Sequence, residues 1–322
     1  MSENTNIEWC DATFNSIIGC APCSTGCQHC YAKTLTERFG KDFAVRRRTT
    51  AANWKKAETW NRKALESYSP GDRNPRVFCA SMADWLDDAD VLMPDGRIDQ
   101  GGVETLADLL DLIRRTPNLD WLLLSKRPEN WMGRIADARD SLLQRGNAAG
   151  GFWCQAWWAS GQQNDGPLVA KPPANVWMGV SAENQEYWDK RVPVLLDIPA
   201  RVRFVSCEPL LGPIDMAYAA FNGADSFGSL EGIHWTIWGG ESGPKARPCN
   251  VEWIRDGVRQ CREAGVAAFV KQLGARPYNG GRDDMYDECV GTAIHYRNRK
   301  GGDMAEWPED LRIREWPEGG ER

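Results

Sequence analysis

The chain has 322 residues, of which 42% are apolar, and a formal net charge of −6 at pH 7. This length and this apolar content predict one large α/β domain, or two smaller domains, with a full hydrophobic core. The negative charge argues against a protein that coats nucleic acid nonspecifically. Because neither a membrane-length apolar run nor a signal peptide is recognisable, we expect a cytoplasmic protein without a membrane partner.

Four of the eleven cysteines lie in one short stretch near the N-terminus, "GCAPCSTGCQHCYA", which spans residues 19–32. In a reducing compartment this number of cysteines does not indicate a disulfide framework. The other seven are scattered, and most of them are expected to be small buried hydrophobic residues. The four clustered cysteines are Cys20, Cys23, Cys27 and Cys30.

A basic segment follows this stretch, with ten Lys or Arg against three acids over residues 33–63. Residues 81–111 show the opposite bias, with nine acids against one Arg. Such segregation can build a local positive patch on an acidic protein, and basic residues mixed with tryptophan suit phosphates and stacked bases. The alternative is a solvated helix face with Trp anchors in the core. The candidate nucleic-acid contacts are Arg46, Arg47, Arg48, Trp54, Lys55 and Lys56.

Short apolar runs then alternate with helical patterns along the chain, which predicts parallel βαβ units. Helices are expected over residues 103–117, 186–199 and 251–266. Strands, with the turns that follow them, are expected over residues 76–84, 120–130, 176–185, 201–213, 234–244 and 267–274.

Each predicted strand ends in polar, chemically capable residues. In a parallel barrel the carboxyl ends of all strands face one side, where active sites lie, whereas an open sheet gathers them only near a switch point. We therefore expect a full or partial barrel. The alternative, that polar residues merely mark where strands leave the core, explains one or two such ends. The strand-end residues are Ser81, Asp84, Ser125, Lys126, Arg127, Ser181, Glu183, Asn184, Cys207, Glu208, Glu241, Ser242, Lys271 and Gln272.

Two segments interrupt the alternation. Residues 146–175 are rich in Gly, Trp and Pro, which predicts a lid or binding loop in which Trp153, Trp157 and Trp158 close over a substrate. Residues 214–232 form a second insertion. We expect a barrel domain over residues 1–276 and a C-terminal extension over residues 277–322 that packs on the barrel.

The spacing of the clustered cysteines favours iron–sulfur ligation over zinc ligation. Two C-x2-C pairs supply four zinc ligands, but only three residues separate the pairs, whereas zinc ribbons usually have a longer excursion there. Iron–sulfur ligation tolerates close spacing because the cysteines bind different corners of a cluster. Cys23, Cys27 and Cys30 read C-x3-C-x2-C and precede Tyr31. This is the spacing of radical S-adenosylmethionine (SAM) enzymes.

A ligand count of three suits that chemistry. Three thiolates hold three irons of a [4Fe–4S] cluster and leave the fourth iron open to the amino and carboxylate groups of SAM. Reductive cleavage of SAM gives a 5′-deoxyadenosyl radical that abstracts hydrogen from an unactivated carbon. The protein must exclude water and hold the target C–H bond against this radical. A cysteine loop after the first strand, at the mouth of a barrel, meets that requirement.

Several motifs in order resemble the phage-associated three-Cys-motif family of the radical SAM superfamily. They are "EWCDATFNSIIGC…STGCQHCYA", "GVSAENQ", "RFVSCEPLLGPID", "WGGESGPKARP", "FVKQLG" and, in the tail, "GGDMAEWPEDLRIREWP". The resemblance implies a partial (β/α)6-type barrel, a [4Fe–4S] cluster and SAM, and, for a phage-encoded protein, the host cytoplasm. It leaves the substrate and the oligomeric state undetermined.

The resemblance leaves the third cluster ligand open. Family members have cysteines at the positions of Cys20, Cys27 and Cys30, a C-x6-C-x2-C spacing in which Cys23 is extra. Cys23 instead completes the usual superfamily spacing. We favour Cys20, because a longer first loop can still reach the cluster corner.

Similarity to the superfamily also implies a division of labour among the strand ends. Ser81 and Asp84 are expected near the amino group of SAM. Basic partners suit its carboxylate, and the residues expected there are Ser125, Lys126 and Arg127. The ribose contacts are expected from Ser181, Glu183 and Asn184. The candidate catalytic residues are Glu208, Glu241 and Lys126, of which Glu241 could instead be a turn residue flanked by permissive glycines.

Three functions follow from these features. The first is a radical SAM isomerase or base-modifying enzyme that rearranges the side chain of a hypermodified thymine in phage DNA, which requires base flipping. The second is a radical SAM enzyme that acts on a free metabolite or peptide. Both need an electron donor such as flavodoxin or ferredoxin. The third is a non-catalytic binding module with a structural cluster or zinc.

Overall fold

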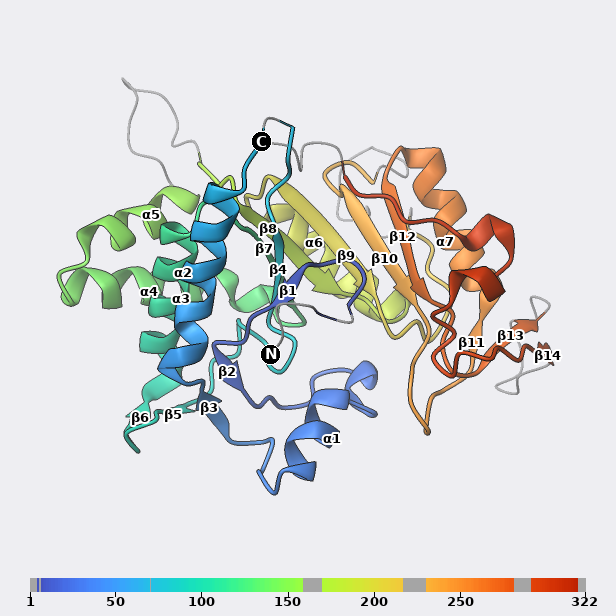
Figure 1. Ribbon diagram of the computed structural model, residues 1–322, viewed down its shortest axis with the longest axis horizontal. Coiled ribbons are helices and arrows are strands. Elements are labelled where there is room, and N and C mark those ends of the chain that lie inside the picture. Colours follow the sequence, from blue (N-terminus) through green and yellow to red (C-terminus); the bar gives the residue numbers. More distant parts are fainter. Residues whose placement is uncertain are drawn as a thin grey trace.

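The computed structural model describes residues 5, 7–69, 71–158, 170–216, 230–280 and 291–317. Its centre is a seven-stranded, all-parallel sheet with the strand order β1-β4-β7-β8-β9-β10-β12 (Figure 1). The sheet curls into a half-barrel, which confirms the expected α/β class and a partial parallel barrel, with one strand more than a (β/α)6-type barrel has. The strands are β1 (Ala12–Thr13), β4 (Arg76–Cys79), β7 (Asp120–Ser125), β8 (Val176–Ser181), β9 (Val202–Cys207), β10 (Trp235–Gly239) and β12 (Ala267–Gln272).

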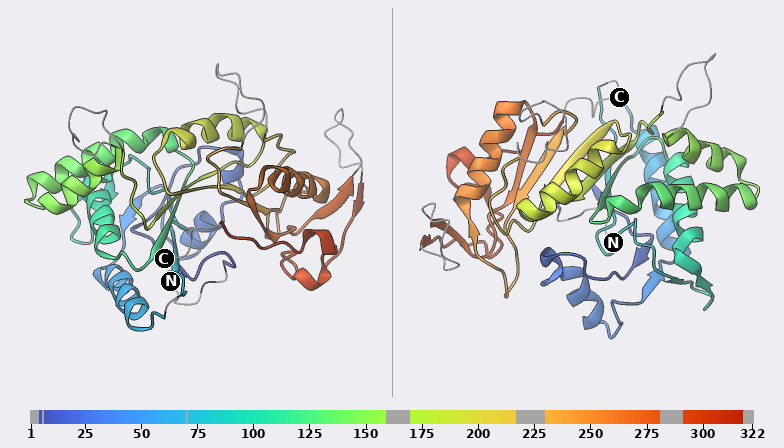
Figure 2. Two further views of the ribbon diagram at one scale, coloured as in Figure 1. Left: turned by 90° about the horizontal axis from the view of Figure 1, so that it is seen from above. Right: turned by 180° about the vertical axis from the view of Figure 1, so that it is seen from behind.

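Amphipathic helices follow most strands and cover the outer face of the sheet, as α6 and α7 do in Figure 2. The patterns at 103–117, 186–199 and 251–266 are helices, as predicted. Asn184 caps α6 by accepting from Tyr187 N, and Gly265, with φ of +69°, ends α7 in the left-handed conformation that glycine favours. The helices are α1 (Tyr31–Arg38), α2 (Ala51–Glu66), α3 (Val103–Arg115), α4 (Trp131–Gln144), α5 (Ala148–Trp158), α6 (Gln185–Asp197) and α7 (Val251–Ala264).

The two faces of the sheet bury different residues. The outer face packs aliphatic side chains against the helices. The inner, concave face carries a separate aromatic cluster, which Trp9 of the N-terminal segment closes at 4.6 Å from the ring of Phe78. Strands buried on both faces read as continuous apolar runs. The concave cluster fills the barrel interior, so the space for a ligand lies at the ends of the strands. Its buried members are Trp9, Phe78, Leu122, Trp177, Val202, Phe204, Trp235, Ile237 and Phe269.

Two small sheets flank the half-barrel. One has the order β2-β3-β5-β6 and joins Ile17–Ile18, Arg46–Arg48, Val91–Leu92 and Ile98–Asp99. The other pairs β11 (Cys249–Asn250), β13 (Pro277–Gly280) and β14 (Gly291–Ala293). In the C-terminal segment, Trp307 and Leu311 are buried, and Val270 N donates to Ile313 O.

The Trp- and Gly-rich segment differs from its prediction. Residues 148–158 are not a lid loop but helix α5, which packs against α3 and α4 on the outer side of the sheet (Figure 1). Trp157 is fully buried and donates from its indole N–H to Pro199 O at 2.7 Å. The clustered apolar side chains therefore enter the core instead of closing over a substrate. Residues 159–169 of this segment lie outside the described residues, as do 217–229 of the second insertion.

None of the seven helices named above, which lie in the described part of the chain, has both the length and the apolar character that crossing a bilayer requires.

Candidate functional site

A cavity of about 390 Å³ opens at the carboxyl ends of the parallel strands. One wall is the cysteine stretch, and the opposite wall is formed by the polar ends of β4, β7, β8, β9, β10 and β12. The strands are parallel, so their carboxyl ends lie on one side, and this explains why residues far apart in sequence meet here. The predicted residues that line it are Cys20, Cys23, Cys27, Cys30, Ser81, Asp84, Ser125, Lys126, Arg127, Ser181, Glu208, Glu241, Ser242, Lys271 and Gln272.

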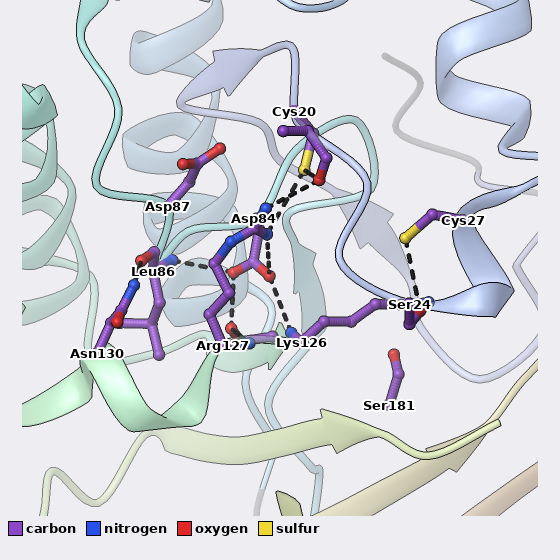
Figure 3. A network of polar contacts seen from close by, with 12 residues as sticks. Cys20, Ser24, Cys27, Asp84, Leu86, Asp87, Lys126, Arg127, Asn130 and Ser181 are labelled. Carbon is purple, nitrogen blue, oxygen red and sulfur yellow. Dashed lines mark hydrogen bonds and ion pairs between the residues drawn. The ribbon is translucent and has the colours of Figure 1, made fainter. Parts of the chain in front are cut away.

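All four clustered cysteines are half-buried and reduced. The Cys20 sulfur lies 3.7 Å from Arg127 Nη1, and the Cys27 sulfur lies 3.5 Å from Ser24 Oγ (Figure 3). Burial raises the pKa of Cys20 to about 11, against the opposing effect of Arg127. A hydrogen bond from the Cys23 thiol lowers the pKa of Cys27 to about 4, and the same bond raises the pKa of Cys23.

The donor set fits an iron–sulfur cluster in its chemistry. Soft thiolates suit Fe–S clusters and zinc, and the cationic groups of Lys126 and Arg127 on the same cavity stabilise anionic sulfur. Within the described residues, no three His, Cys, Asp or Glu side chains converge closely enough to hold a single metal ion. A single zinc ion requires all sulfurs within about 2.3 Å of one point, whereas the ligands of a cluster bind separate irons.

Asp84 organises the cavity wall next to Cys20 (Figure 3). Its buried carboxylate accepts from Ser125 Oγ at 2.6 Å, from Lys126 N at 2.8 Å and from Arg127 Nη1 at 3.2 Å. Arg127 also donates from Nη2 to Ala21 O at 2.8 Å. The ends of β4 and β7 thus hold one guanidinium against the cysteine stretch, and the pKa of Arg127 is raised because Asp84 and nearby thiols outweigh its burial.

The structure gives Glu183 partners other than a ribose. Its carboxylate is fully buried and accepts from Lys126 Nζ, from Ser24 Oγ at 2.7 Å and from Arg191 Nη1 at 2.9 Å. Burial raises the pKa of Glu183, but Lys126 and Arg191 outweigh this effect and bring the pKa below its usual value. Neither Glu183 nor Asn184 lines the cavity, so of the three predicted ribose contacts only Ser181 faces it.

Glu208 and Lys271 form an ion pair of 3.0 Å on the cavity wall. The pair spans β10 at Gly239, where a Cβ atom would stand 2.5 Å from Glu208 Oε1. Only glycine leaves room for this carboxylate to reach from β9 to β12. Burial lowers the pKa of Lys271, but Glu208 outweighs it, and the net shift is upward, which keeps the ammonium charged.

Glu241 lines the cavity and is bound on both sides by groups of the fold. Its carboxylate accepts from Arg247 Nη2 at 2.8 Å and from Arg247 N at 2.8 Å, and it lies 3.1 Å from His29 Nδ1. Burial raises the pKa of Glu241, but the bonds from Arg247 and His29 bring it below its usual value. All three candidate catalytic residues, Lys126, Glu208 and Glu241, are therefore ion-paired.

Two arginines of the basic segment are paired with the acidic segment within the fold. Arg46 pairs with Asp87 at 2.7 Å, and Arg48 pairs with Asp108 at 2.8 Å. Arg47 donates to the carbonyl oxygens of residues 42 and 45. These three residues form strand β3.

Trp54 also has a partner within the fold. The Arg48 guanidinium lies 4.1 Å from the centre of its ring, and Trp54 packs edge-on against Phe14. Lys55 and Lys56 lie beside it on α2, and the structure brings none of these residues to the cavity.

Four residues of the site have no sequence signal that we recognised: Ser24, Gly26, Arg191 and Arg247. Arg191 lies on α6 and reaches back to Glu183, which precedes the helix, and their spacing of eight residues does not by itself indicate this contact. Arg247 follows Glu241 in the motif "GGESGPKARP", which we interpreted without it.

Comparison with known proteins gives one match. The model of a family described as "Protein of unknown function (DUF5131)" matches residues 4–305. No curated protein and no solved structure matches the chain. Because the family model covers most of the chain, this protein is a member of the DUF5131 family.

Proposed function

We propose that this protein is a radical SAM enzyme that holds a [4Fe–4S] cluster in the cysteine stretch. One observation carries the proposal: four half-buried cysteines of a single loop line the cavity at the carboxyl ends of an all-parallel half-barrel. Thiolates are the ligands of such clusters, and the strand ends of parallel barrels are where active sites lie.

The contact between Cys23 and Cys27 supports Cys20, Cys27 and Cys30 as the three ligands. A thiol that is hydrogen-bonded to a neighbouring sulfur is too close to bind a different iron without rearranging. Cys27 is a ligand under either spacing, so Cys23 is the residue to set aside. Its S–H then remains a donor to the Cys27 thiolate.

When bound, the cluster would supply the electron that cleaves SAM into methionine and a 5′-deoxyadenosyl radical. The residues of this chain would bind SAM and orient it. Arg127, held by Asp84, offers a guanidinium to the carboxylate of SAM, and the hydroxyl of Ser181 faces the same cavity. The aromatic cluster on the concave face closes the barrel below the site.

For the substrate, we keep the side chain of a hypermodified thymine in phage DNA as the first candidate, supported by the resemblance to phage proteins. A free metabolite or peptide is the second candidate. The ion pairs of Arg46 and Arg48 favour the second, because these side chains are already neutralised within the fold. Retention on DNA that falls with salt, and that is lost when residues 46–48 are neutralised, would support the first.

The experiment is anaerobic purification followed by iron analysis and reduction with dithionite in the presence of SAM. We expect a brown protein with four irons per chain that releases 5′-deoxyadenosine, and a C27A/C30A variant that does neither. A colourless zinc protein would contradict the proposal and favour a binding module. Flavodoxin or ferredoxin in place of dithionite tests the expected electron donor.

A further inference from the structure

The cysteine stretch has little structure of its own. Between Cys20 and Cys30 the only regular element is a single 3-10 turn at Thr25–Cys27, which has no buried residue and no side-chain cap. Backbone hydrogen bonds within it are limited to this turn and to the bond from Cys30 N to Cys27 O. The stretch has further contacts with the strand ends on which it lies.

Glu183 is the deepest of these contacts. Its carboxylate has no exposed surface, and its two oxygens are shared among Lys126, Arg191 and Ser24. Ser24 lies between Cys23 and Cys27 in sequence, and its hydroxyl also contacts the Cys27 sulfur at 3.5 Å. A single buried anion thus connects β8, β7 and α6 to the centre of the cysteine stretch.

The backbone of the stretch at Gly26 also packs closely against the Glu183 side chain. A Cβ atom on Gly26 would stand 2.4 Å from Glu183 Oε1 and 2.6 Å from its Cγ. The turn therefore lies directly on the Glu183 side chain, and only a glycine permits this approach. Next to it, Tyr187 Oη accepts from Thr25 N at 3.3 Å.

We propose that Glu183 is a positioning residue that holds the cysteine stretch in its ligand-ready arrangement before any metal binds. The metal-free protein then has a preformed cradle rather than a mobile loop that a cluster must order. That the cysteines would hold an iron–sulfur cluster rests on the proposed function. That Glu183 holds the cysteine stretch in place does not.

The other contacts of the stretch come from side chains that are more exposed than Glu183. Arg127, which exposes 12% of its side chain, donates to Ala21 O at 2.8 Å. Arg247 donates to Thr25 O at 2.9 Å, and His29 lies on Glu241, and Arg247 and His29 each expose about a quarter of their side chains. An interaction between buried charges loses more when one partner is removed, because the remaining charges stay unpaired. Glu183 is for this reason the contact whose loss should release the stretch.

The test measures the reaction of the cysteines with iodoacetamide in the metal-free protein, resolved by site with mass spectrometry. In E183Q we expect Cys23 and Cys27 to react about tenfold faster than in the wild type, while the buried Cys154 stays protected. L109A is the matched control, because it removes a buried core side chain of α3 and lowers stability without touching the stretch.

Equal reaction rates in E183Q and wild type would overturn the proposal, as would an equal acceleration in L109A, which would mean that general loss of stability exposes the thiols. S24A, which removes one bond to Glu183 and leaves its charge paired, is expected to accelerate the reaction by a smaller factor. After reconstitution, E183Q should also release iron to a chelator faster than the wild type. If neither the wild type nor E183Q binds iron, the proposed function is wrong. The iodoacetamide rates still decide whether Glu183 positions the cysteine stretch.

Discussion

Gly26 is the residue at which the cysteine stretch meets the half-barrel most closely. A G26A substitution places a methyl group 2.4 Å from Glu183 Oε1, and this carboxylate is fully buried and held by Lys126 and Arg191. We expect a loss of about 1–3 kcal/mol in the free energy of unfolding, measured by urea denaturation. G133A on α4 is the control: no atom lies within 4 Å of its added Cβ, and alanine is expected to gain up to about 1 kcal/mol there. Equal stability of G26A and wild type would contradict the close packing.

Which three of the four cysteines bind the cluster can be tested one residue at a time. Single alanine variants of the four cysteines, purified without oxygen, are expected to divide into two classes by iron content. C20A, C27A and C30A should lose most of their iron, because each removes one corner of the cluster, whereas C23A should keep it. A C20A protein with its full iron content would show that Cys23 is the third ligand.

At the scale of elements, helix α5 distinguishes a core element from a lid. W157A removes a fully buried indole and its bond to Pro199 O, and we expect a cost of about 3–5 kcal/mol in the free energy of unfolding. Cleavage of SAM per folded molecule should stay unchanged, since Trp157 does not line the cavity. A variant that stays stable but loses affinity for its substrate would restore the lid interpretation.

The order of elements was predictable, and the reason is physical. Strands buried on both faces are continuous apolar runs, and the residues at their carboxyl ends must meet on one side of a parallel sheet. The four cysteines with Asp84 and Arg127 were therefore brought together as expected. The periodicity of α5 was not visible, because a helix that is apolar on most sides gives little contrast between its faces.

The partners of the charged residues were not predictable from the chain. The sequence shows that Glu183 ends a strand, but whether its carboxylate faces a ligand or an arginine depends on the rotation of α6, which places Arg191 beneath it. The same holds for two residues of the basic segment: Arg46 and Arg48 meet acids 41 and 60 residues away, and no local pattern encodes that pairing.

For the whole molecule, stability should depend on pH through the buried carboxylates. The pKa values of Glu183 and Glu241 lie below the ordinary value in the folded protein. Each group thus contributes stability that is fully present above its unfolded pKa of about 4.3 and is lost as the pH falls through the folded value. The free energy of unfolding should decrease as the pH is lowered from about 5 to 3. E183Q should flatten this dependence, and an unchanged slope in E183Q would contradict the assigned shift.

We propose that three cysteines hold a [4Fe–4S] cluster and leave one iron open to SAM. Mössbauer spectroscopy of protein enriched in ⁵⁷Fe, recorded with and without SAM, tests it most directly. We predict that SAM changes the signal of one iron in four and leaves the other three unaltered, because only one iron lacks a thiolate. A spectrum in which every iron keeps its signal on addition of SAM, or a protein that contains no cluster, would contradict the account.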